Sequence, residues 1–466
     1  MSQTEARSFD GPSTGAAVGR AEEPTGPKGD ASASLIRTLT VTIFLQWLGA
    51  TAIVPMLPIY IRHLGGSDAL AGMVMAAFFA AGVVSQYPVG RMADRIGRRP
   101  VLVGGLVTYG VASLSFLAPV GPGAAVGLRA VQGLGAGAAA VASLAMIAGS
   151  VPSERRGRAF AAVYGGEIAG MAVGPLVGSI AGVAHMSAMF IASGAVSFAA
   201  CVPALRLAEV ARSAPNSPTV SPRGEPSTTS PPTRLAPVRL NRAMAGAFVT
   251  AGALGLASGV YDICWTLLLV SRGATGWEIG ISWTLFAVPF LVAARPSGWL
   301  ADHMDRRVLV VAGVGVSAIF CASYPFLTSV GALVILGALE ALGFAACLPA
   351  VQSLLTQGSS PEEAGRVQGI FATCQTGFTA VAAAGAGAAF AVARWLPFVT
   401  VAALASIGLV AVVVIWSRVP GRVSPGAALA ADSIAGPRAV WGESIQLGMA
   451  GAAGSSEVIG VSEEVQ

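Results

Sequence analysis

Charged residues are scarce in this sequence. Asp, Glu, Lys and Arg make up 11% of its 466 residues, whereas soluble globular domains carry about 25%. Hydrophobic residues account for 54% of the chain. Because a surface that faces water cannot be built from so few charges, the composition excludes a soluble globular protein and predicts that a lipid bilayer surrounds most of the chain.

Residues that carry chemistry are equally sparse. The three histidines, His63, His185 and His303, lack the His-Glu-x-x-His pattern of zinc proteases. The five cysteines stand singly in apolar stretches, so we interpret them as packing residues rather than zinc ligands or disulfides. The Walker phosphate-binding sequence is absent as well. These absences argue against an enzyme or an ATP-driven pump, and they predict no metal site and no cofactor.

Twelve apolar segments follow one another along the chain, and each approaches the ~20 residues that cross a bilayer as a helix. Polar stretches at 1–34 and 418–466 are predicted to be disordered tails, and a Pro/Ser/Thr/Arg-rich stretch at 208–241 is predicted to be a linker. We therefore predict an all-α membrane protein with twelve transmembrane helices in two six-helix halves, 35–207 and 242–417. The predicted spans are 35–61, 69–90, 100–119, 123–149, 158–181, 185–207, 243–270, 277–300, 307–328, 330–357, 366–391 and 395–417.

Arginines are concentrated in alternate loops, whereas the opposite loops offer only Arg62, Arg272 and Arg394. Lys and Arg in short loops stay on the cytoplasmic side of a membrane. We therefore expect a multi-pass protein of the plasma membrane with both termini and the linker in the cytoplasm. The net charge is +5, but the basic residues lie between apolar spans rather than on one soluble face, so no nucleic-acid partner is expected.

An internal repeat supports the division into halves. The segment 90–99 matches 298–307 at a Gly, an Ala, an Asp and both final arginines, and the offset is 208 residues. The loop 154–158 matches 362–366 at the same offset. Parallel halves of this kind are typical of transporters that bind their substrate between the halves near the membrane midplane.

The repeated loop has residue types that suit a tight, charged turn. Glycine permits a bend, Asp94 can accept hydrogen bonds from exposed helix N-terminal amides, and the arginines can pair with carboxylates or lipid phosphates. Anchoring by positive charge alone would also explain the arginines. The candidate residues of the loop and its copy are Gly90, Asp94, Arg95, Gly97, Arg98, Arg99, Asp302 and Arg306.

This loop resembles the G-x-L-A-D-R-x-G-R-R/K-x-x-L signature of the major facilitator superfamily, with Met92 in place of the usual Leu. Three further segments, 48–58, 129–135 and 170–178, resemble signatures of its drug:proton antiporters. The resemblance implies proton-driven antiport and a part for Arg129 in proton coupling. It also implies that Gly170, Gly174, Pro175 and Gly178 form a hinge or a seal against leakage, although their four-residue spacing is explained equally by close helix packing.

Three carboxylates lie in the interior of predicted spans rather than at their ends, and we rank them as proton-coupling candidates in the order Glu340, Glu167 and Asp262. A carboxylate in a low-dielectric environment can load and release a proton near neutral pH. Arg129 is costly to bury, so we expect it to face a wet cavity or a partner, unless it snorkels to the interface. For each acid, a structural salt bridge with Arg129 or Arg295 is the alternative interpretation.

Polar and aromatic side chains within the spans could line a substrate cavity, although most aromatic residues of membrane proteins serve packing. The candidates are Gln46, Trp47, Gln132, Tyr164, Trp265, Trp283, Phe286, Gln352, Phe371 and Gln375.

The sequence thus predicts a monomeric secondary transporter that uses the proton gradient to export small amphipathic molecules by rocking its two halves. An uptake symporter or facilitator for a small metabolite is the alternative within transport. A membrane receptor that transports nothing is the alternative outside it.

Overall fold

The structure is a computed structural model that describes residues 27–118, 121–151, 153–207, 240–357 and 361–420. Every regular element within these ranges is a helix. The predicted linker and most of both predicted tails lie outside the described residues. The first helix begins at Pro27 rather than at Leu35, so the predicted N-terminal tail is shorter than the sequence indicated.

The N-terminal half is built from seven α-helices and a short 3-10 turn, and the C-terminal half from eight α-helices, a π-turn and a 3-10 turn. The N-terminal elements are α1 (Pro27–Ala52), α2 (Leu57–His63), α3 (Asp68–Ile96), α4 (Arg98–Ser115), α5 (Ala124–Ser150), α6 (Ser153–Ala181), η1 (Val183–His185) and α7 (Met186–Leu205). The C-terminal elements are α8 (Arg242–Val260), η2 (Tyr261–Trp265), α9 (Thr266–Ser271), α10 (Gly276–Val292), α11 (Ala294–His303), α12 (Arg306–Ser323), η3 (Tyr324–Phe326), α13 (Val330–Leu355), α14 (Pro361–Val392) and α15 (Leu396–Trp416).

Local sequence explains where several of these helices begin. The Ser67 side chain accepts a hydrogen bond from the Leu70 backbone N–H and caps α3. Thr275 and Glu278 form a reciprocal capping box at the start of α10. Gly97 has a φ of 107°, which only glycine adopts readily, and this residue makes the tight turn between α3 and α4.

Most helices are long and apolar enough to cross a membrane. Among the described residues ten spans meet these criteria, with α1 and α2 counted as one and α8, η2 and α9 counted as one. The bent pair formed by α10 and Pro296–His303 of α11 brings the number to eleven. The shorter α4 packs against α5 and α7 and completes the six rods of the N-terminal half. The predicted all-α membrane fold with two six-helix halves is confirmed.

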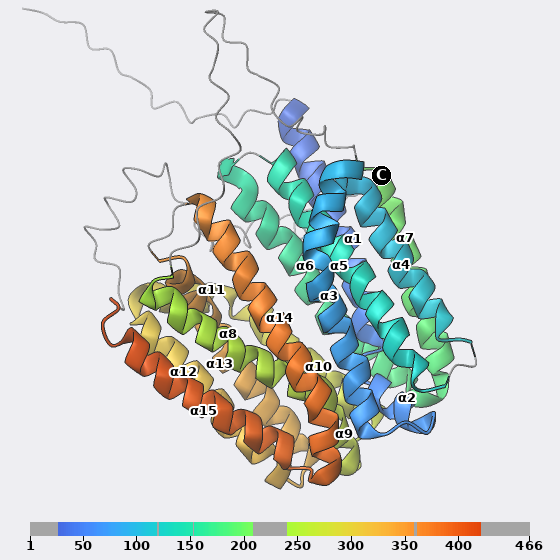
Figure 1. Ribbon diagram of the computed structural model, residues 1–466, viewed down its shortest axis with the longest axis vertical. Coiled ribbons are helices and arrows are strands. Elements are labelled where there is room, and N and C mark those ends of the chain that lie inside the picture. The colour runs from blue at the N-terminus through green and yellow to red at the C-terminus, as the bar shows by residue number, and fades with distance from the viewer. Residues whose placement is uncertain (1–26, 119–120, 152, 208–239, 358–360, 421–466) are drawn as a thin grey trace, which may run out of the picture.

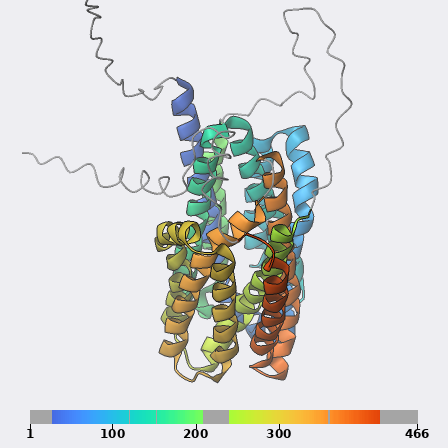
Figure 2. The same cartoon turned by 90° about the vertical axis from the view of Figure 1, so that its left-hand side faces the viewer.

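The two halves lie side by side (Figure 1), and their long helices run roughly parallel to one another in the view turned by 90° (Figure 2). Each half has its own buried core near the arginine-rich loops: one includes Leu102 and Met146, the other Val310 and Leu354. A third core contains residues of both halves. This shared core includes Met56, Leu57, Ile61 and Val74 with Ile263, Leu267, Leu268, Leu269 and Phe390. The halves are therefore packed together at the end opposite the arginine-rich loops.

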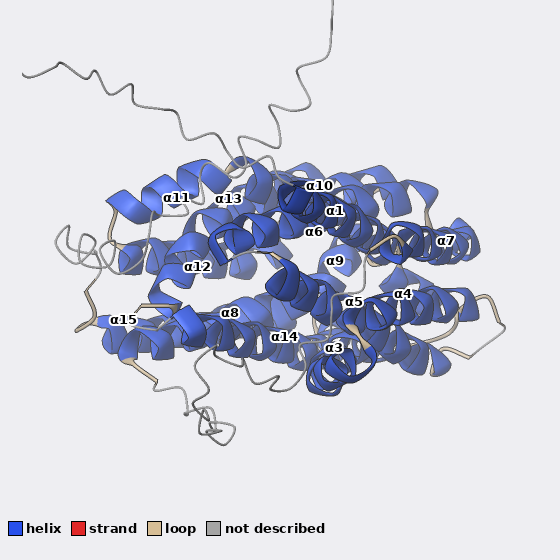
Figure 3. Ribbon diagram, turned by 90° about the horizontal axis from the view of Figure 1, so that it is seen from above, coloured by secondary structure: helices blue, strands red, loops and turns tan. Residues whose placement is uncertain are grey.

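Two helix pairs carry most of the contact between the halves, α3 with α14 and α6 with α10. Figure 3 shows both pairs from above. A Cβ added to Gly72 of α3 would lie 2.6 Å from the carbonyl oxygen of Ala383 on α14, so glycine is required for this approach. The Thr284 hydroxyl of α10 donates a hydrogen bond of 2.7 Å to the Ala172 carbonyl of α6. Small residues thus let the two halves meet backbone to backbone.

Candidate functional site

Glu340 is the centre of a buried polar cluster in the C-terminal half. It lies in α13, and 2% of its surface is exposed. The Tyr261 hydroxyl donates a hydrogen bond of 2.7 Å to Oε1, and the Tyr324 hydroxyl donates one of 2.5 Å to Oε2. The Ser317 hydroxyl donates a further hydrogen bond to Oε1. One carboxylate of α13 therefore joins η2 to the continuous segment formed by α12 and η3, which is distant from η2 in the sequence.

Aromatic rings surround this carboxylate. The rings of Trp265 and Tyr324 lie edge to face with centroids 5.0 Å apart, and Tyr261 contacts both in the same geometry. The indole N–H of Trp265 donates a hydrogen bond of 3.0 Å to the Ser282 hydroxyl on α10. The phenol and indole groups are thereby fixed in position, and water has little access to the carboxylate.

The three candidate acids form no ion pair with any residue in the part of the chain that the structure describes. The alternative prediction of a salt bridge with Arg129 is therefore wrong for the described side chains, and the side chain of Arg295 lies outside them. Glu167 is half-buried on α6. Asp262 is half-buried in η2, and its charge interacts with that of Arg129 across the boundary between the halves.

Arg129 lies on α5 and is 1% exposed, so the prediction that it snorkels to the interface is wrong. Its guanidinium donates a hydrogen bond of 2.9 Å to Gln132 and stacks 4.4 Å from the ring centroid of Phe78. Gln132 in turn donates to Ser113 at 2.8 Å. Nε of Arg129 and the hydroxyl of Tyr109 have no partner among the described residues. Arg129 therefore places a buried guanidinium in the N-terminal half.

The two copies of the charged loop are built differently. In the first copy Gly97 makes the turn, and Asp94 is exposed and has no hydrogen-bond partner among the residues that the structure describes, so the prediction that Asp94 accepts from helix amides is wrong for these residues. In the second copy Asp305, at the position equivalent to Gly97, accepts a hydrogen bond of 2.9 Å from the Arg307 backbone and begins α12. The carboxylate of Asp302 pairs with Arg306 at 3.7 Å.

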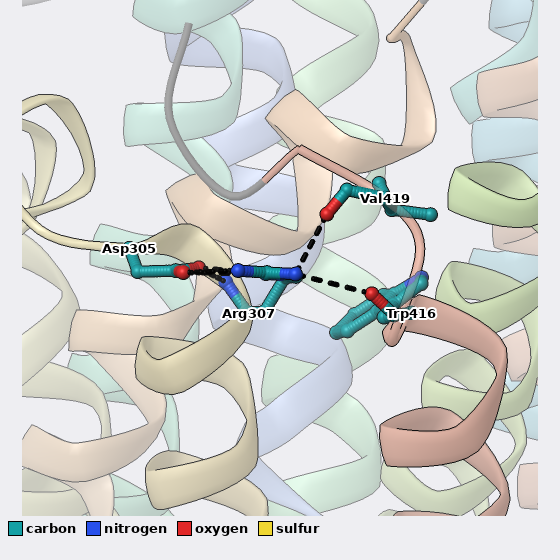
Figure 4. A network of polar contacts seen from close by, with 4 residues as sticks. All are labelled: Asp305, Arg307, Trp416 and Val419. Atoms are coloured by element: carbon teal, nitrogen blue, oxygen red, sulfur yellow. Dashed lines mark hydrogen bonds and ion pairs between the residues drawn. The ribbon is translucent and has the colours of Figure 1, made fainter.

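Arg307 connects this second loop to the end of α15 (Figure 4). Its guanidinium pairs with Asp305 at 2.6 Å and donates to the carbonyl oxygens of Trp416 at 3.2 Å and Val419 at 2.7 Å. The Trp416 indole N–H donates to the Ala243 carbonyl at the start of α8. This network, which we call the Arg307 clamp, joins α8, α12 and α15 of one half. The repeated sequence motif did not predict this network, because the partners of Arg307 on and after α15 are backbone carbonyls.

The remaining first-copy residues lie in or next to α3 and α4. Gly90 is within α3 rather than in the predicted turn, and Arg95 lies in the last turn of that helix. Arg98 packs its guanidinium against Gly149 of α5, and Arg99 is half-buried in the first turn of α4. The loop is thus partly packed onto the end of α5 and partly exposed.

The glycines of the antiporter-like segment lie on the face of α6 that packs on α1. A Cβ at Gly170 would lie 2.7 Å from the Phe44 carbonyl oxygen, and one at Gly174 would lie 2.7 Å from that of Leu48. A Cβ at Gly178 would overlap the Ala52 carbonyl oxygen. Pro175 lies inside the helix, as predicted. Close packing within one half therefore accounts for these glycines.

The predicted cavity residues divide into two groups. Gln46, Gln132 and Phe371 are buried within one half, and Trp265 is buried in the shared core, so these four side chains are engaged in packing. Tyr164 is exposed, and the others are half-buried: Trp47, Trp283, Phe286, Gln352 and Gln375.

Sequence reasoning missed the hydroxyl donors of Glu340. Tyr261, Ser317 and Tyr324 stand 79, 23 and 16 residues from it along the chain. Polar side chains in apolar spans were a visible signal, but nothing in the sequence indicated that these three converge on one acid. It also missed the hydrogen bond of 2.9 Å between Thr373 of α14 and Gln86 of α3, which crosses between the halves.

Comparison with known proteins identifies similar transporters. The tetracycline resistance protein, class E, of Escherichia coli is 27% identical over 357 residues, which cover 73% of this chain and 84% of that protein. The quinolone resistance protein NorA of Staphylococcus aureus is 27% identical over 158 residues, 34% of this chain and 41% of NorA. In fold, the chain is similar to a bacterial homologue of the human lysosomal transporter Spinster, with a TM-score of 0.66 at 14% identity over 84% of this chain and 98% of that one. It is also similar to the nucleoside transporter NupG, with a TM-score of 0.62 at 15% identity over 82% and 100%.

A family profile described as Major Facilitator Superfamily matches residues 39–262 and 247–456, so one match falls on each half. These matches, together with the helical fold, confirm the resemblance found in the sequence motifs. The protein is a multi-pass membrane transporter of small molecules rather than an enzyme, and the chain belongs to the major facilitator superfamily.

Proposed function

We propose that the protein is a monomeric, proton-coupled exporter of small amphipathic organic molecules, and that Glu340 is the principal proton carrier. The observation that carries this proposal is a carboxylate with 2% exposure, enclosed by three hydroxyl donors and without a cationic partner among the described residues. Export of an amphipathic cargo is supported by similarity to the tetracycline and quinolone resistance proteins.

Two opposing effects act on the Glu340 proton. Burial in a low-dielectric environment favours the neutral acid, whereas hydrogen bonds from hydroxyl donors favour the carboxylate. A small change in the position of one donor therefore changes which form is favoured. Since the donors come from two separate segments, η2 and the continuous segment of α12 and η3, movement between helices alters the proton affinity of this group.

Asp262 and Arg129 supply a second link between charge and conformation. Asp262 belongs to the C-terminal half and Arg129 to the N-terminal half, and their charges interact while the shared core is intact. Protonation of Asp262 removes this attraction and favours separation of the halves at that end. Glu167 on α6 is the third candidate carrier, because it is a half-buried carboxylate within a span.

We place the arginine-rich loops and both termini in the cytoplasm, because positive loops stay on that side. The shared core then closes the outer end, and the cargo path opens toward the cytoplasm. The exposed or half-buried candidates Tyr164, Phe286, Gln352 and Gln375 would line this path. The proton gradient is the energy source, and no cofactor takes part.

Proteoliposomes with an imposed pH gradient test the proposal. A panel of lipophilic cations, neutral compounds and acids is offered to wild type, to Glu340→Gln and to the control Glu278→Gln, which alters an exposed helix cap. We expect Glu340→Gln to lose pH-driven accumulation but to retain counterflow exchange, and the control to behave as wild type. Undiminished pH-driven transport by Glu340→Gln would remove this acid from the mechanism. Cargo and protons moving in the same direction would establish uptake symport instead.

A further inference from the structure

The first span of each half loses regular α-helical structure at the same point of the repeat. In the N-terminal half α1 ends at Ala52 and α2 begins at Leu57. Adding the repeat offset of 208 residues to positions 52 and 57 gives positions 260 and 265 of the C-terminal half. The π-turn η2, Tyr261–Trp265, occupies this stretch. Single π-turns contain one residue more than the α-helix accommodates and occur frequently at functional sites. The two irregularities both lie in the shared core.

The residues of η2 contact three different helices. Tyr261 donates to Glu340 on α13. Cys264 lies with its sulfur 3.6 Å from the Ala386 carbonyl oxygen on α14, and Trp265 donates to Ser282 on α10. The π-helix is rare compared with the α-helix, so contacts of this kind are needed to hold the turn.

Helix α9 continues directly from this turn and helps to seal the shared core. Its residues Leu267, Leu268 and Leu269 are buried there, and α9 contacts α2 of the other half. Removing the extra residue of η2 would rotate α9 by about 100°, the angle between successive residues of an α-helix. A rotation of that size would move the buried leucines out of the shared core.

We infer that Tyr261 is a positioning residue that lets Glu340 control the outer seal. While its hydroxyl is bonded to Glu340, η2 stays a π-turn and α9 keeps its leucines in the shared core. When the hydroxyl is released, η2 relaxes toward an α-helix and α9 turns out of the seal. The inference rests on the proposed exchange between two conformations, but it does not require that protons drive that exchange.

A matched pair of variants tests this inference. Tyr261→Phe and Tyr324→Phe each remove one phenolic hydroxyl from the same carboxylate and keep the ring, but only Tyr261 belongs to η2. Hydrogen exchange is measured on the full chain in detergent at one pH, without cargo or gradient. We expect Tyr261→Phe to speed exchange in α2 and α9 by about tenfold or more, the effect of losing a hydrogen bond to a charged acceptor. Tyr324→Phe is expected to leave both segments protected.

A second pair covers the case in which Tyr261→Phe does not fold. Glu340→Gln and Glu340→Ala both remove the charge, but only Gln keeps an oxygen that can accept from Tyr261. We expect α9 to lose protection in the Ala variant and to keep it in the Gln variant.

Equal exchange in α9 for both members of a pair would overturn the inference. That result would leave the proposed proton coupling intact, since coupling is measured separately as pH-driven transport. Conversely, absence of pH-driven transport in wild type would refute proton coupling and leave the role of Tyr261 standing.

Discussion

Gly387 on α14 offers a direct way to disturb the shared core. A Cβ at this position would overlap the carbonyl oxygen of Asp68 at the start of α3 in the other half, so Gly387→Ala requires the two helices to move apart. Gly385 lies on the same helix, and a Cβ there would meet nothing within 4 Å. Both substitutions gain the same helix propensity, so their difference reports the contact alone.

Overpacking of this kind costs about 1–3 kcal/mol. If the halves alternate between two arrangements, Gly387→Ala loses that free energy only in the arrangement seen here, with the shared core closed. The population should therefore shift by about 5- to 150-fold toward the arrangement in which α3 and α14 separate. The control Gly385→Ala should leave the population unchanged.

Resonance energy transfer between two dyes measures this population shift as a change in the distance between them. The dyes are attached through unnatural amino acids at His63 and Trp277, which are exposed near the closed end of opposite halves. We expect the mean distance between the dyes to lengthen in Gly387→Ala and to match wild type in Gly385→Ala. Identical distance distributions in the two variants would refute the reasoning, because they would show that the seal tolerates a methyl group at its tightest crossing.

Four further variants probe stability in detergent by thermal unfolding. Arg307→Ala should lower the free energy of unfolding by about 1–2 kcal/mol, because the Arg307 clamp loses a charge-assisted pair and two hydrogen bonds to carbonyl oxygens. Arg306→Ala should lower it by less, because the partner of Arg306 is largely exposed. Equal losses of stability in the two variants would contradict the importance of the clamp. Hydrogen bonding from Arg307 holds the pKa of Asp305 below its usual range, so its stabilisation is present above the unfolded value of about 3.9 and is lost as pH falls through the folded value. Asp305→Asn should accordingly be less stable than wild type at pH 7, with the gap closing below about pH 4, and a gap independent of pH would contradict this. Gly178→Ala should cost about 2–3 kcal/mol by forcing α6 away from Ala52, and wild-type stability would contradict the packing seen at that crossing.

The global fold was predictable because it follows from properties that individual residues carry. Apolar length defines a span, and the repeat offset relates one half to the other whatever the helices contact. The position of Glu340 deep within its span could be predicted for the same reason. Its donors could not, because Tyr261 of η2 meets Ser317 and Tyr324 only after η2 and the α12–η3 segment have packed around α13.

Predictions failed where the backbone departs from the regular pattern. The π-turn at η2 has no local sequence signature, since the contacts that hold it come from α10, α13 and α14. The prediction that Asp94 of the charged loop caps a helix failed for a related reason. Asp94 and Asp302 match in the repeat, yet the residue that caps a helix is Asp305, because Asp replaces the positive-φ glycine of the first copy.

On helix α6, the residues that pack closely within one half differ from the residues that contact the other half. Its glycines Gly170, Gly174 and Gly178 meet the α1 backbone of their own half, and that contact does not need to change when the halves rock.

A different set of residues on α6 meets α10 of the other half. The Ala172 carbonyl accepts from Thr284 at 2.7 Å, and a Cβ at Gly280 would lie 3.0 Å from Leu176 and 3.1 Å from the side chain of Ser179. If the halves rock as rigid bodies, this second contact breaks and the first is preserved. In that case the glycine motif keeps α6 attached to its own half, while Ala172, Leu176 and Ser179 form the part of the helix surface that separates.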